Sequence, residues 1–445
     1  MNQLLTIGAA LQTQATGLPC LIESFLGGGA QGEVYAATLA GQAVAVKWYF
    51  PQYLRQDPDL RRRLEQIIRY GAPSDRFLWP LDLVTWSEAE AGFGYIMPLR
   101  EARFKGLTDL VTRRVNPSFR TLISCGFELA LNYRKLHEKG LCYRDIAFGN
   151  LFFDPETGEV RIGDNDNVDV NNRRGAISGT PRFMAPEIVR GEAEPNAQTD
   201  LFSLATLLFY LLCNHHPLEG ARELAIRCFD QAAMTRLYGQ EPLFIFDPQD
   251  ERNRPVPGEQ DNPLLFWPLY PQALRNQFTR AFTAGINDPE HGRVRESEWC
   301  NTLVVLRDAI VHCPLCQAEN FYDPAARRLG APPVCWACQQ PIPAPARLRI
   351  AHRNERMLLI LNRDSQLFPH HLNPSADFDF GVAVGAVVVH PQQPTVWGLE
   401  NRSTDKWVAT TAAGAVHEVA PGRRATIATG TRLHFGLSEG EIRVG

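Results

Sequence analysis

The sequence has no long apolar run and no strong excess of charge of either sign. Its first residues, MNQLLTIGAALQTQATG, include no basic residue, so they lack the positive region of a secretory signal. No segment approaches the roughly 18 apolar residues that a membrane-spanning helix needs. The 45 basic and 49 acidic residues give a net charge of -4, and no overall field points to nucleic acid or to an anionic membrane. We therefore expect a soluble, cytoplasmic protein with no nucleic-acid or membrane partner.

Cysteine is sparse along most of the chain and concentrated in one short stretch. Six of the ten cysteines are scattered among apolar residues, as buried free thiols are in a reducing compartment. The others form CPLC and CWAC, separated by 18 residues (317 to 334). Thiolates at this spacing can close a tetrahedral shell, although buried thiols or a redox pair are alternatives. We predict a structural Zn²⁺ site formed by Cys313, Cys316, Cys335 and Cys338.

Acidic and amide residues alternate in GDNDNVDVNNRRG at 163–175, as they do in calcium-binding loops. Counted from Asp164, an EF-hand loop needs glycine at its sixth position and glutamate at its twelfth. This chain has Asp169 and Gly175 at those positions, and counting from Asn165 also fails. The stretch is not a calcium loop, and its meaning depends on the motifs around it.

Six short motifs follow one another in a fixed order between residues 20 and 312. They are SFLGGGAQGEVY, VAVK, YRDIAFGN, GDND, MAPE and DLFSLA. Glycines alone could simply build tight turns, but the whole series resembles the protein kinase family, and GTPRFMAPE resembles its serine/threonine type. The resemblance implies an α+β, bilobal protein kinase fold at 1–312, with a β-rich N-lobe at about 15–97 and a helical C-lobe at about 98–312.

The resemblance also implies ATP and Mg²⁺ as cofactors. Asp145 is then expected to accept the proton of a substrate hydroxyl, and Asn150 and Asp164 to hold Mg²⁺. A helical glutamate should hold Lys47, and Glu65 is the only glutamate between Lys47 and residue 88. Its alternative is a solvated residue beside the arginines at 61–63. The expected nucleotide-binding residues are Gly27, Gly29, Gly32, Val34, Ala45, Lys47, Met97 and Leu99.

Several residues depart from the family pattern. Asn165 and Asp166 stand where the family has the phenylalanine and glycine of its DFG motif. Asp166 could reach a metal ion or make a local turn hydrogen bond. Tyr143 replaces a histidine, and Ala147 replaces a lysine that meets the γ-phosphate. Two functions stay open: a serine/threonine kinase that phosphorylates protein substrates and itself, or a nucleotide-binding pseudokinase scaffold that acts through its C-terminal modules.

The residue before the catalytic aspartate suggests a regulatory loop. Arg144 occupies a position that the family links to activation by a phosphate on the following loop. Ser178 and Thr180 are the hydroxyls available there, and we expect autophosphorylation at Ser178, or at Thr180, to order the loop through Arg144. In its alternative role Thr180 contacts the catalytic aspartate as part of a substrate platform. Arg293 resembles the late arginine that pairs with Glu187 of MAPE.

Beyond the kinase-like part we place a zinc ribbon at 313–340 and a proline-rich linker at 341–349, because PIPAPAR is typical of a semi-rigid spacer. From 350 to 445, short apolar runs broken by turn signals indicate an all-β sandwich. The overall arrangement resembles bacterial kinases of the eukaryotic-like serine/threonine type.

The last segment is similar to a forkhead-associated (FHA) domain in its polar loop, its late PG turn and its closing strand. The resemblance implies a phosphoprotein or signalling partner. Asn401, Arg402 and Ser403 are the nearest counterparts of the residues with which such domains bind phosphothreonine. The early glycine-arginine phosphate loop is not evident, so a degenerate module that contacts the kinase or another protein is the alternative.

Overall fold

The computed structural model describes residues 3–87, 92–170, 179–324, 333–352 and 355–445. The chain divides into two compact units. The first comprises Met1–Pro268 and Gln272–Asn301, and the second comprises Leu269–Pro271 and Thr302–Gly445. The boundary therefore falls inside helix α12 (Glu296–Asp308), earlier than the end at residue 312 that we expected for the kinase-like part.

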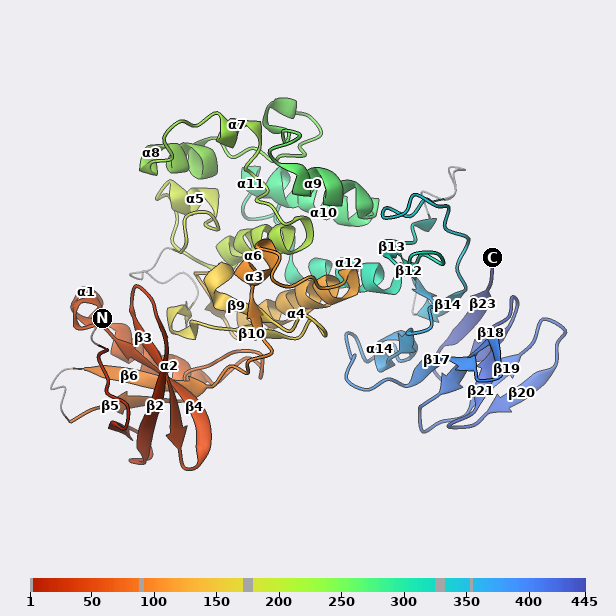
Figure 1. Ribbon diagram of the computed structural model, residues 1–445, viewed down its shortest axis with the longest axis horizontal. Coiled ribbons are helices and arrows are strands. Elements are labelled where there is room, and N and C mark those ends of the chain that lie inside the picture. Colours follow the sequence, from red (N-terminus) through yellow and green to blue (C-terminus); the bar gives the residue numbers. More distant parts are fainter. Residues whose placement is uncertain (1–2, 88–91, 171–178, 325–332, 353–354) are drawn as a thin grey trace. The chain divides into compact units, whose positions relative to one another are not determined.

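The first unit begins with a closed antiparallel barrel in the strand order β1-β2-β3-β4-β6-β5 (Figure 1). The strands are β1 (Ala10–Thr13), β2 (Pro19–Gly28), β3 (Gly32–Leu39), β4 (Gln42–Tyr49), β5 (Asp82–Thr85) and β6 (Phe93–Pro98). The apolar and small residues that alternate around the glycine cluster predict a β-hairpin followed by a strand with Lys47. This prediction is confirmed, because β2 pairs with β3 and β3 with β4. A Cβ atom on Gly32 would lie 2.2 Å from the carbonyl oxygen of Trp48, so only glycine fits where β3 and β4 begin to pair.

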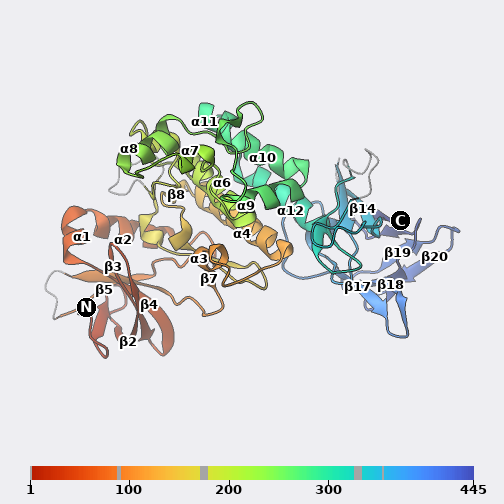
Figure 2. The same cartoon turned by 45° about the horizontal axis from the view of Figure 1, so that its top comes forward.

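Two helices lie beside the barrel, α1 (Pro51–Gln56) and α2 (Leu60–Tyr70) (Figure 2). From the sequence alone we predict a single helix here, at about 57–70 and beginning near Asp57 and Pro58. The chain instead breaks at Asp57, whose φ and ψ are -129° and 75°, because a residue before proline is pushed out of the helical region. Leu60, Arg63, Leu64 and Ile67 form the buried face of α2.

Helices dominate the rest of the first unit. The helical period of the apolar residues at 119–139 predicts a helix there, which is α4 (Phe119–Glu138). The nearly all-apolar stretch 200–213 predicts a buried core helix, and it lies in α6 (Ala197–Cys213), which is buried from Thr199 onward. In the described part of the chain, no helix combines the length and apolar character needed to cross a membrane. The other helices are α3 (Leu107–Val111), α5 (Pro186–Val189), α7 (Ala221–Leu224), α8 (Gln231–Met234), α9 (Asp261–Phe266), α10 (Gln272–Phe282) and α11 (Ala284–Asn287), with a π-helix at Thr235–Gln240.

Short strands and turns near the barrel shape the site. Two small antiparallel sheets have the strand orders β10-β9-β7 and β11-β8. Their strands are β7 (Lys105–Gly106), β8 (Leu141–Cys142), β9 (Leu151–Phe153), β10 (Val160–Ile162) and β11 (Asp169–Val170). The 3₁₀ turns η1 (Phe148–Asn150) and η2 (Asn165–Asn167) carry several of the predicted site residues.

The second unit contains a cysteine-bearing hairpin and a β-sandwich. The hairpin strands β12 (Ile310–His312) and β13 (Glu319–Phe321) pair antiparallel. One sandwich sheet has the order β15-β14-β23-β22-β19-β20 and the other has the order β16-β17-β18-β21, and apolar side chains from both sheets form one core. The strands are β14 (Arg347–His352), β15 (Glu355–Ile360), β16 (Gln366–Leu367), β17 (Gly385–His390), β18 (Gln393–Asn401), β19 (Trp407–Thr410), β20 (Val416–Val419), β21 (Arg424–Thr426), β22 (Arg432–His434) and β23 (Glu439–Arg443), with the short helix α14 (Pro369–Leu372).

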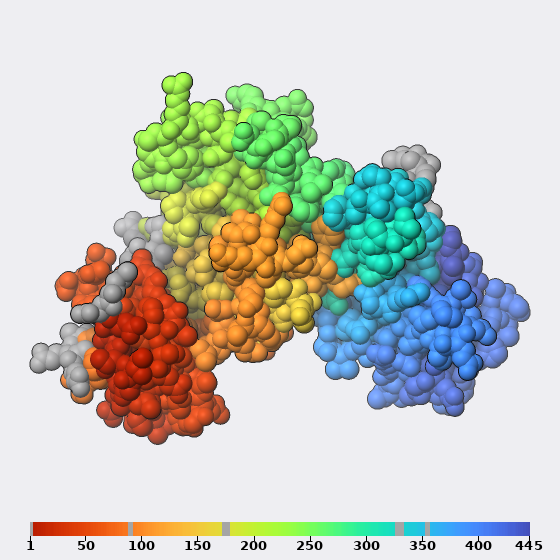
Figure 3. All heavy atoms as spheres, viewed as in Figure 1, coloured from red at the N-terminus to blue at the C-terminus, as the bar shows by residue number. Residues whose placement is uncertain are grey.

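The predicted linker at 341–349 differs from what the structure shows. Ile342 is buried in a small core with Val311, Tyr322 and Ile360, and β14 already begins at Arg347. The ribbon and the sandwich therefore share packed side chains, and their surfaces are continuous where cyan meets blue (Figure 3). A proline-rich sequence did not reveal this packing because its few apolar residues have no period from which burial can be predicted.

Candidate functional site

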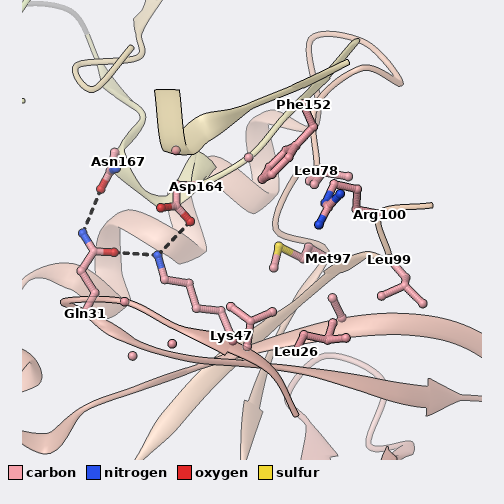
Figure 4. Close-up of a pocket in the computed structure, with 18 of the residues that line it drawn as sticks. Leu26, Gln31, Lys47, Leu78, Met97, Leu99, Arg100, Phe152, Asp164 and Asn167 are labelled. Carbon is pink, nitrogen blue, oxygen red and sulfur yellow. Dashed lines mark hydrogen bonds and ion pairs between the residues drawn. The ribbon is translucent and has the colours of Figure 1, made fainter. Parts of the chain in front are cut away.

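A cavity of about 530 Å³ lies between the glycine-rich end of the barrel and the turns that follow β8 and β10. Apolar side chains, among them Leu26, Met97 and Phe152, occupy one end, whereas Lys47 and Asp164 occupy the other (Figure 4). All eight residues expected to bind nucleotide line this cavity, namely Gly27, Gly29, Gly32, Val34, Ala45, Lys47, Met97 and Leu99.

Lys47 is the buried cation at the polar end, with 4% of its surface exposed. Its Nζ lies 2.8 Å from Asp166 Oδ2 and 3.3 Å from Asp164 Oδ1, and it donates to Gln31 Oε1 at 2.6 Å. Burial lowers the pKa of Lys47, but the charges of Asp166 and Asp164 outweigh it, so the pKa lies above its usual value. Lys47 is therefore a fixed positive charge at the polar end of the cavity.

The expected ion pair between Lys47 and Glu65 does not form in this structure. Glu65 lies 3.5 Å from Arg61 Nε and accepts from Gln14 Nε2 at 3.3 Å, on the partly exposed side of α2. The physical reason is the helical period: the inward positions of α2 are taken by its apolar residues and Arg63. Glu65 was predicted only because it is the sole glutamate between Lys47 and residue 88, and this criterion does not consider which face of the helix points inward.

Asp166 takes neither of the two roles considered for it. Its Oδ2 bonds Lys47 and accepts from the Tyr49 hydroxyl at 2.5 Å, and it is buried outside the residues that line the cavity. A signal for this contact exists in the sequence: Tyr49 follows Lys47 by two positions on β4 and so projects from the same face. The contact of Gln31 with Lys47 was also not predicted, because the glycine-rich loop was interpreted from its glycines at 29 and 32 and not from its polar side chain.

Asp164 keeps the exposure that a metal ligand needs. Its side chain is 43% exposed and lines the cavity. The backbone of Asp164 is left-handed, with φ 42°, a conformation that a non-glycine residue rarely adopts. Burial and the charge of Asp166 raise the pKa of Asp164, although Lys47 opposes them. Next to it, the fully buried Asn165 donates to the carbonyl oxygen of Ile162 at 2.9 Å.

The loop between β8 and β9 brings Asp145 to the cavity. Thr180 Oγ1 donates to Asp145 Oδ1 at 2.7 Å, as in the platform role considered for it. Asn150 Nδ2 donates to the carbonyl oxygen of Asp145 at 2.8 Å and to its Oδ2 at 3.2 Å. This leaves the side-chain oxygen of Asn150 as the atom that could bind a cation.

The same loop is anchored from α6. Asp200 accepts from the backbone N–H of Tyr143 at 2.5 Å and from that of Arg144 at 2.9 Å. The Tyr143 hydroxyl donates to the carbonyl oxygen of Gly163, so this tyrosine ties the loop to the turn before Asp164. Ala147 is buried, and among the described residues only Lys47 and Arg100 bring cationic side chains to the lining.

Two arginines around the loop are paired with carboxylates. Arg144 Nη2 lies 3.5 Å from Asp169 Oδ2, and both side chains are buried. Arg293 Nη2 donates to both carboxylate oxygens of Glu187, at 2.7 and 2.8 Å, which joins the pair suggested by the resemblance. Ser178 lies outside the described residues.

The four predicted zinc ligands lie together in the second unit. Their sulfur atoms lie within 4.8 Å of one another, and the Cys313–Cys338 and Cys316–Cys335 pairs are each 3.6 Å apart. A tetrahedral Zn²⁺ with bonds of about 2.3 Å requires sulfur atoms about 3.8 Å apart, so the donor set fits this ion.

The two cysteine turns have matching backbones. The backbone N–H of Gln317 donates to the carbonyl oxygen of Cys313 at 3.0 Å, and that of Gln339 donates to the carbonyl oxygen of Cys335 at 2.9 Å. Both glutamines are left-handed, with φ of 62° and 59°. Asn320 Nδ2 also approaches Cys335 Sγ at 3.5 Å, which is the kind of donor that supports a thiolate ligand.

The polar loop of the sandwich uses its side chains internally. Asn401 is fully buried and donates to the carbonyl oxygens of Asp405 and Val419 at 2.7 and 2.9 Å. Ser403 Oγ donates to Asn401 Oδ1 at 2.7 Å, and Arg402 pairs with Glu400 at 2.8 Å. These contacts stabilise the loop.

Comparison with known families finds a similarity within the first unit. The model of the protein kinase domain matches residues 83–259. This part of the chain is therefore similar to the protein kinase domain, and the relatives below are kinases, one of them named as a serine/threonine type. The matched residues begin after β4, so the glycine-rich loop and Lys47 lie outside the match. They line the same cavity as Asp145 and Asp164, which lie within it.

Similar curated proteins are kinases of much greater length. One, named as a probable serine/threonine-protein kinase of Dictyostelium discoideum, is 26% identical over 234 residues, covering 50% of this chain and 14% of its own. The atypical protein kinase C of Drosophila melanogaster is 33% identical over 117 residues, 25% of this chain and 19% of its own. The protein kinase C delta type of Rattus norvegicus is 32% identical over 105 residues, 23% and 14% of the two chains. The chain thus spans less than a fifth of each of these relatives.

Proposed function

We propose that this protein is an ATP-dependent serine/threonine protein kinase that phosphorylates protein substrates and itself. One observation carries the proposal: Lys47, Asp145 and Asp164 converge on one cavity whose other end is apolar. A cavity with one apolar end and one charged end suits a nucleotide, and its volume of about 530 Å³ is within the usual range for small-molecule sites. The two-lobed kinase architecture is part of this proposal.

Each residue has a physical task in phosphoryl transfer. Bound ATP and Mg²⁺ supply the phosphoryl group and the neutralising charge. Lys47 offers the phosphates a fixed positive charge, and Asp164 with the side-chain oxygen of Asn150 would hold the metal ion. Asp145 would accept the proton of the substrate hydroxyl while the hydroxyl oxygen bonds to the γ-phosphorus and the bond from that phosphorus to the ADP leaving group breaks. Thr180, which donates to Asp145 at 2.7 Å, orients that carboxylate.

The second unit would support rather than perform catalysis. A closed shell of four thiolates leaves no coordination position for substrate, so Zn²⁺ there stabilises the ribbon. The sandwich would act as a docking module for a protein partner, with phosphothreonine recognition as its FHA-like form. Metal analysis of purified protein should find one zinc per chain, and a Cys335→Ser Cys338→Ser variant should lose it; zinc well below one per chain in the unmutated protein would contradict the assignment.

Radiolabelled ATP with Mg²⁺ tests the kinase function directly. We expect label on the protein itself and on a generic serine- and threonine-rich substrate, and no label with Asp145→Asn or Asp164→Ala. Asp75→Asn is the matched control, because the Asp75 side chain is 81% exposed. Nucleotide binding by thermal shift without any transfer would contradict the kinase function and favour the pseudokinase scaffold. Phosphopeptide mapping would show whether Ser178 or Thr180 is modified.

A further inference from the structure

Helix α2 offers Lys47 no carboxylate. Glu65 is the one acidic residue of α2, and its side chain is 34% exposed beside Arg61. The polar residue on the buried face is Arg63, whose Nη1 donates to Asp57 Oδ1 at 2.8 Å. A second cation facing inward would repel Lys47 rather than hold it.

Lys47 nevertheless needs a partner that fixes its position. An ammonium group on a four-carbon stem has many rotamers, and ordering it requires directed contacts. Asp166 supplies such a contact from the turn η2, with Oδ2 2.8 Å from Nζ and its side chain 1% exposed. The Tyr49 hydroxyl donates to the same oxygen at 2.5 Å, so the carboxylate is held by two donors on β4.

Asp164 cannot fill this role equally well. It lies farther from Nζ, at 3.3 Å, and 43% of its side chain is exposed. A carboxylate open to the cavity remains free to turn toward a metal ion, whereas the buried Asp166 does not line the cavity. Asp166 is therefore placed to hold Lys47, and Asp164 is left available to a metal ion.

We propose that Asp166 is the positioning residue for Lys47 in phosphoryl transfer, in place of a carboxylate from α2. The inference rests on the proposed kinase function. It places the positioning carboxylate and Asp164 in the same turn, so that Lys47 is aligned by the segment that also faces the metal ion. Placement of Lys47 then does not depend on how α2 is rotated.

Steady-state kinetics of four variants test this assignment. We expect Asp166→Asn to lower kcat/KM for ATP by about 10- to 100-fold, the effect of losing one charge-assisted hydrogen bond. The loss should lie mainly in kcat, because phosphate charge is redistributed in the transition state. Asp166→Glu should recover part of it. Glu65→Gln should stay within about twofold of the unmutated protein, as should Asp59→Asn, a surface control with a side chain 66% exposed.

A binding readout separates positioning from a general loss of structure. The dissociation constant of a fluorescent ATP analogue with Mg²⁺ is measured in the unmutated protein, in Asp166→Asn and in Asp166→Glu. Because a positioning residue acts mainly on kcat, analogue binding by Asp166→Asn should stay within about threefold of the unmutated protein while its kcat falls. Binding lost in proportion to kcat, no recovery of kcat in Asp166→Glu, or a Glu65→Gln loss as large as that of Asp166→Asn would overturn the inference.

The outcomes remain interpretable in less favourable cases. If Asp166→Asn does not fold, Glu65→Gln alone decides, because a tenfold loss there returns the role to α2. If the unmutated protein transfers no phosphate, the kinase proposal fails by itself. If the unmutated protein transfers phosphate and Asp166→Asn keeps its full kcat, only the role of Asp166 is overturned.

Discussion

The two segments that meet at the polar end of the cavity are held in different ways. The catalytic loop between β8 and β9 is anchored from a distance by Asp200 of α6, which binds two of its backbone N–H groups. The segment from Asp164 to β11 instead carries carboxylates of its own, since Asp166 bonds Lys47 and Asp169 pairs with Arg144. One segment is positioned by the helical core, and the other neutralises the cations around it.

Removal of the distant anchor should have the largest effect. Asp200→Asn takes a buried charge away from two backbone donors and from His137, whose Nε2 lies 3.1 Å from Asp200 Oδ2. We expect the free energy of unfolding to fall by about 3–5 kcal/mol and kcat to fall about 100-fold. Urea unfolding and kinase assays check this. With Asp75→Asn as the surface control, a loss below about 1 kcal/mol would contradict the anchoring role.

The local carboxylate of the second segment should come next. Asp169→Asn removes the carboxylate that lies 3.5 Å from the buried Arg144 guanidinium in the native protein. We expect a loss of about 3 kcal/mol in unfolding free energy. The double variant Arg144→Met Asp169→Leu should be less destabilised than this single variant, because it buries no charge at either position. Equal losses in both variants would show that the pair itself is not what matters.

The sequence predicted the parts of the site that depend on local spacing. The residues of each cysteine pair, of the glycine-rich hairpin and of the Asp145–Asn150 loop lie within a few positions of one another, and the two C-x2-C pairs have the spacing of a zinc site. The partner of Lys47 depended on which face of α2 points inward. Leu60, Leu64 and Ile67 mark that face at helical spacing, and Glu65 lies off it, but choosing the only glutamate in the range made no use of this period. Ion pairs such as Arg144–Asp169 also join separate elements and are set by tertiary packing rather than by any local pattern.

The anchor on α6 should also make stability depend on pH. His137 is buried between Asp200 and Glu296. Burial lowers its pKa, but the hydrogen bonds to these carboxylates outweigh it and raise the pKa from 6.5 to about 9. Because the folded state binds the proton more tightly, this stabilisation is complete below pH about 6.5 and is lost as pH rises through 9.

Urea unfolding at several pH values measures this contribution. The shift from 6.5 to about 9 corresponds to at most about 3 kcal/mol, lost between those pH values. A His137→Gln variant removes the titrating group and should show a flatter dependence over the same window. Parallel curves for the two proteins would mean that other groups produce the slope.

The smallest effect on stability and activity is expected at Tyr49, whose hydroxyl is the second donor to Asp166 after Lys47. Tyr49→Phe removes the hydroxyl that bonds Asp166 at 2.5 Å while leaving Lys47 in place, so we expect a loss of about 1 kcal/mol in unfolding free energy and a two- to fivefold fall in kcat.

Tyr53 is the matched control. Its ring stacks 5.9 Å from that of Tyr49, but its buried hydroxyl has no hydrogen-bond partner among the residues that the structure describes. Tyr53→Phe should therefore change neither quantity measurably. Equal effects at the two tyrosines would mean that ring packing, and not orientation of the carboxylate, is what Tyr49 contributes.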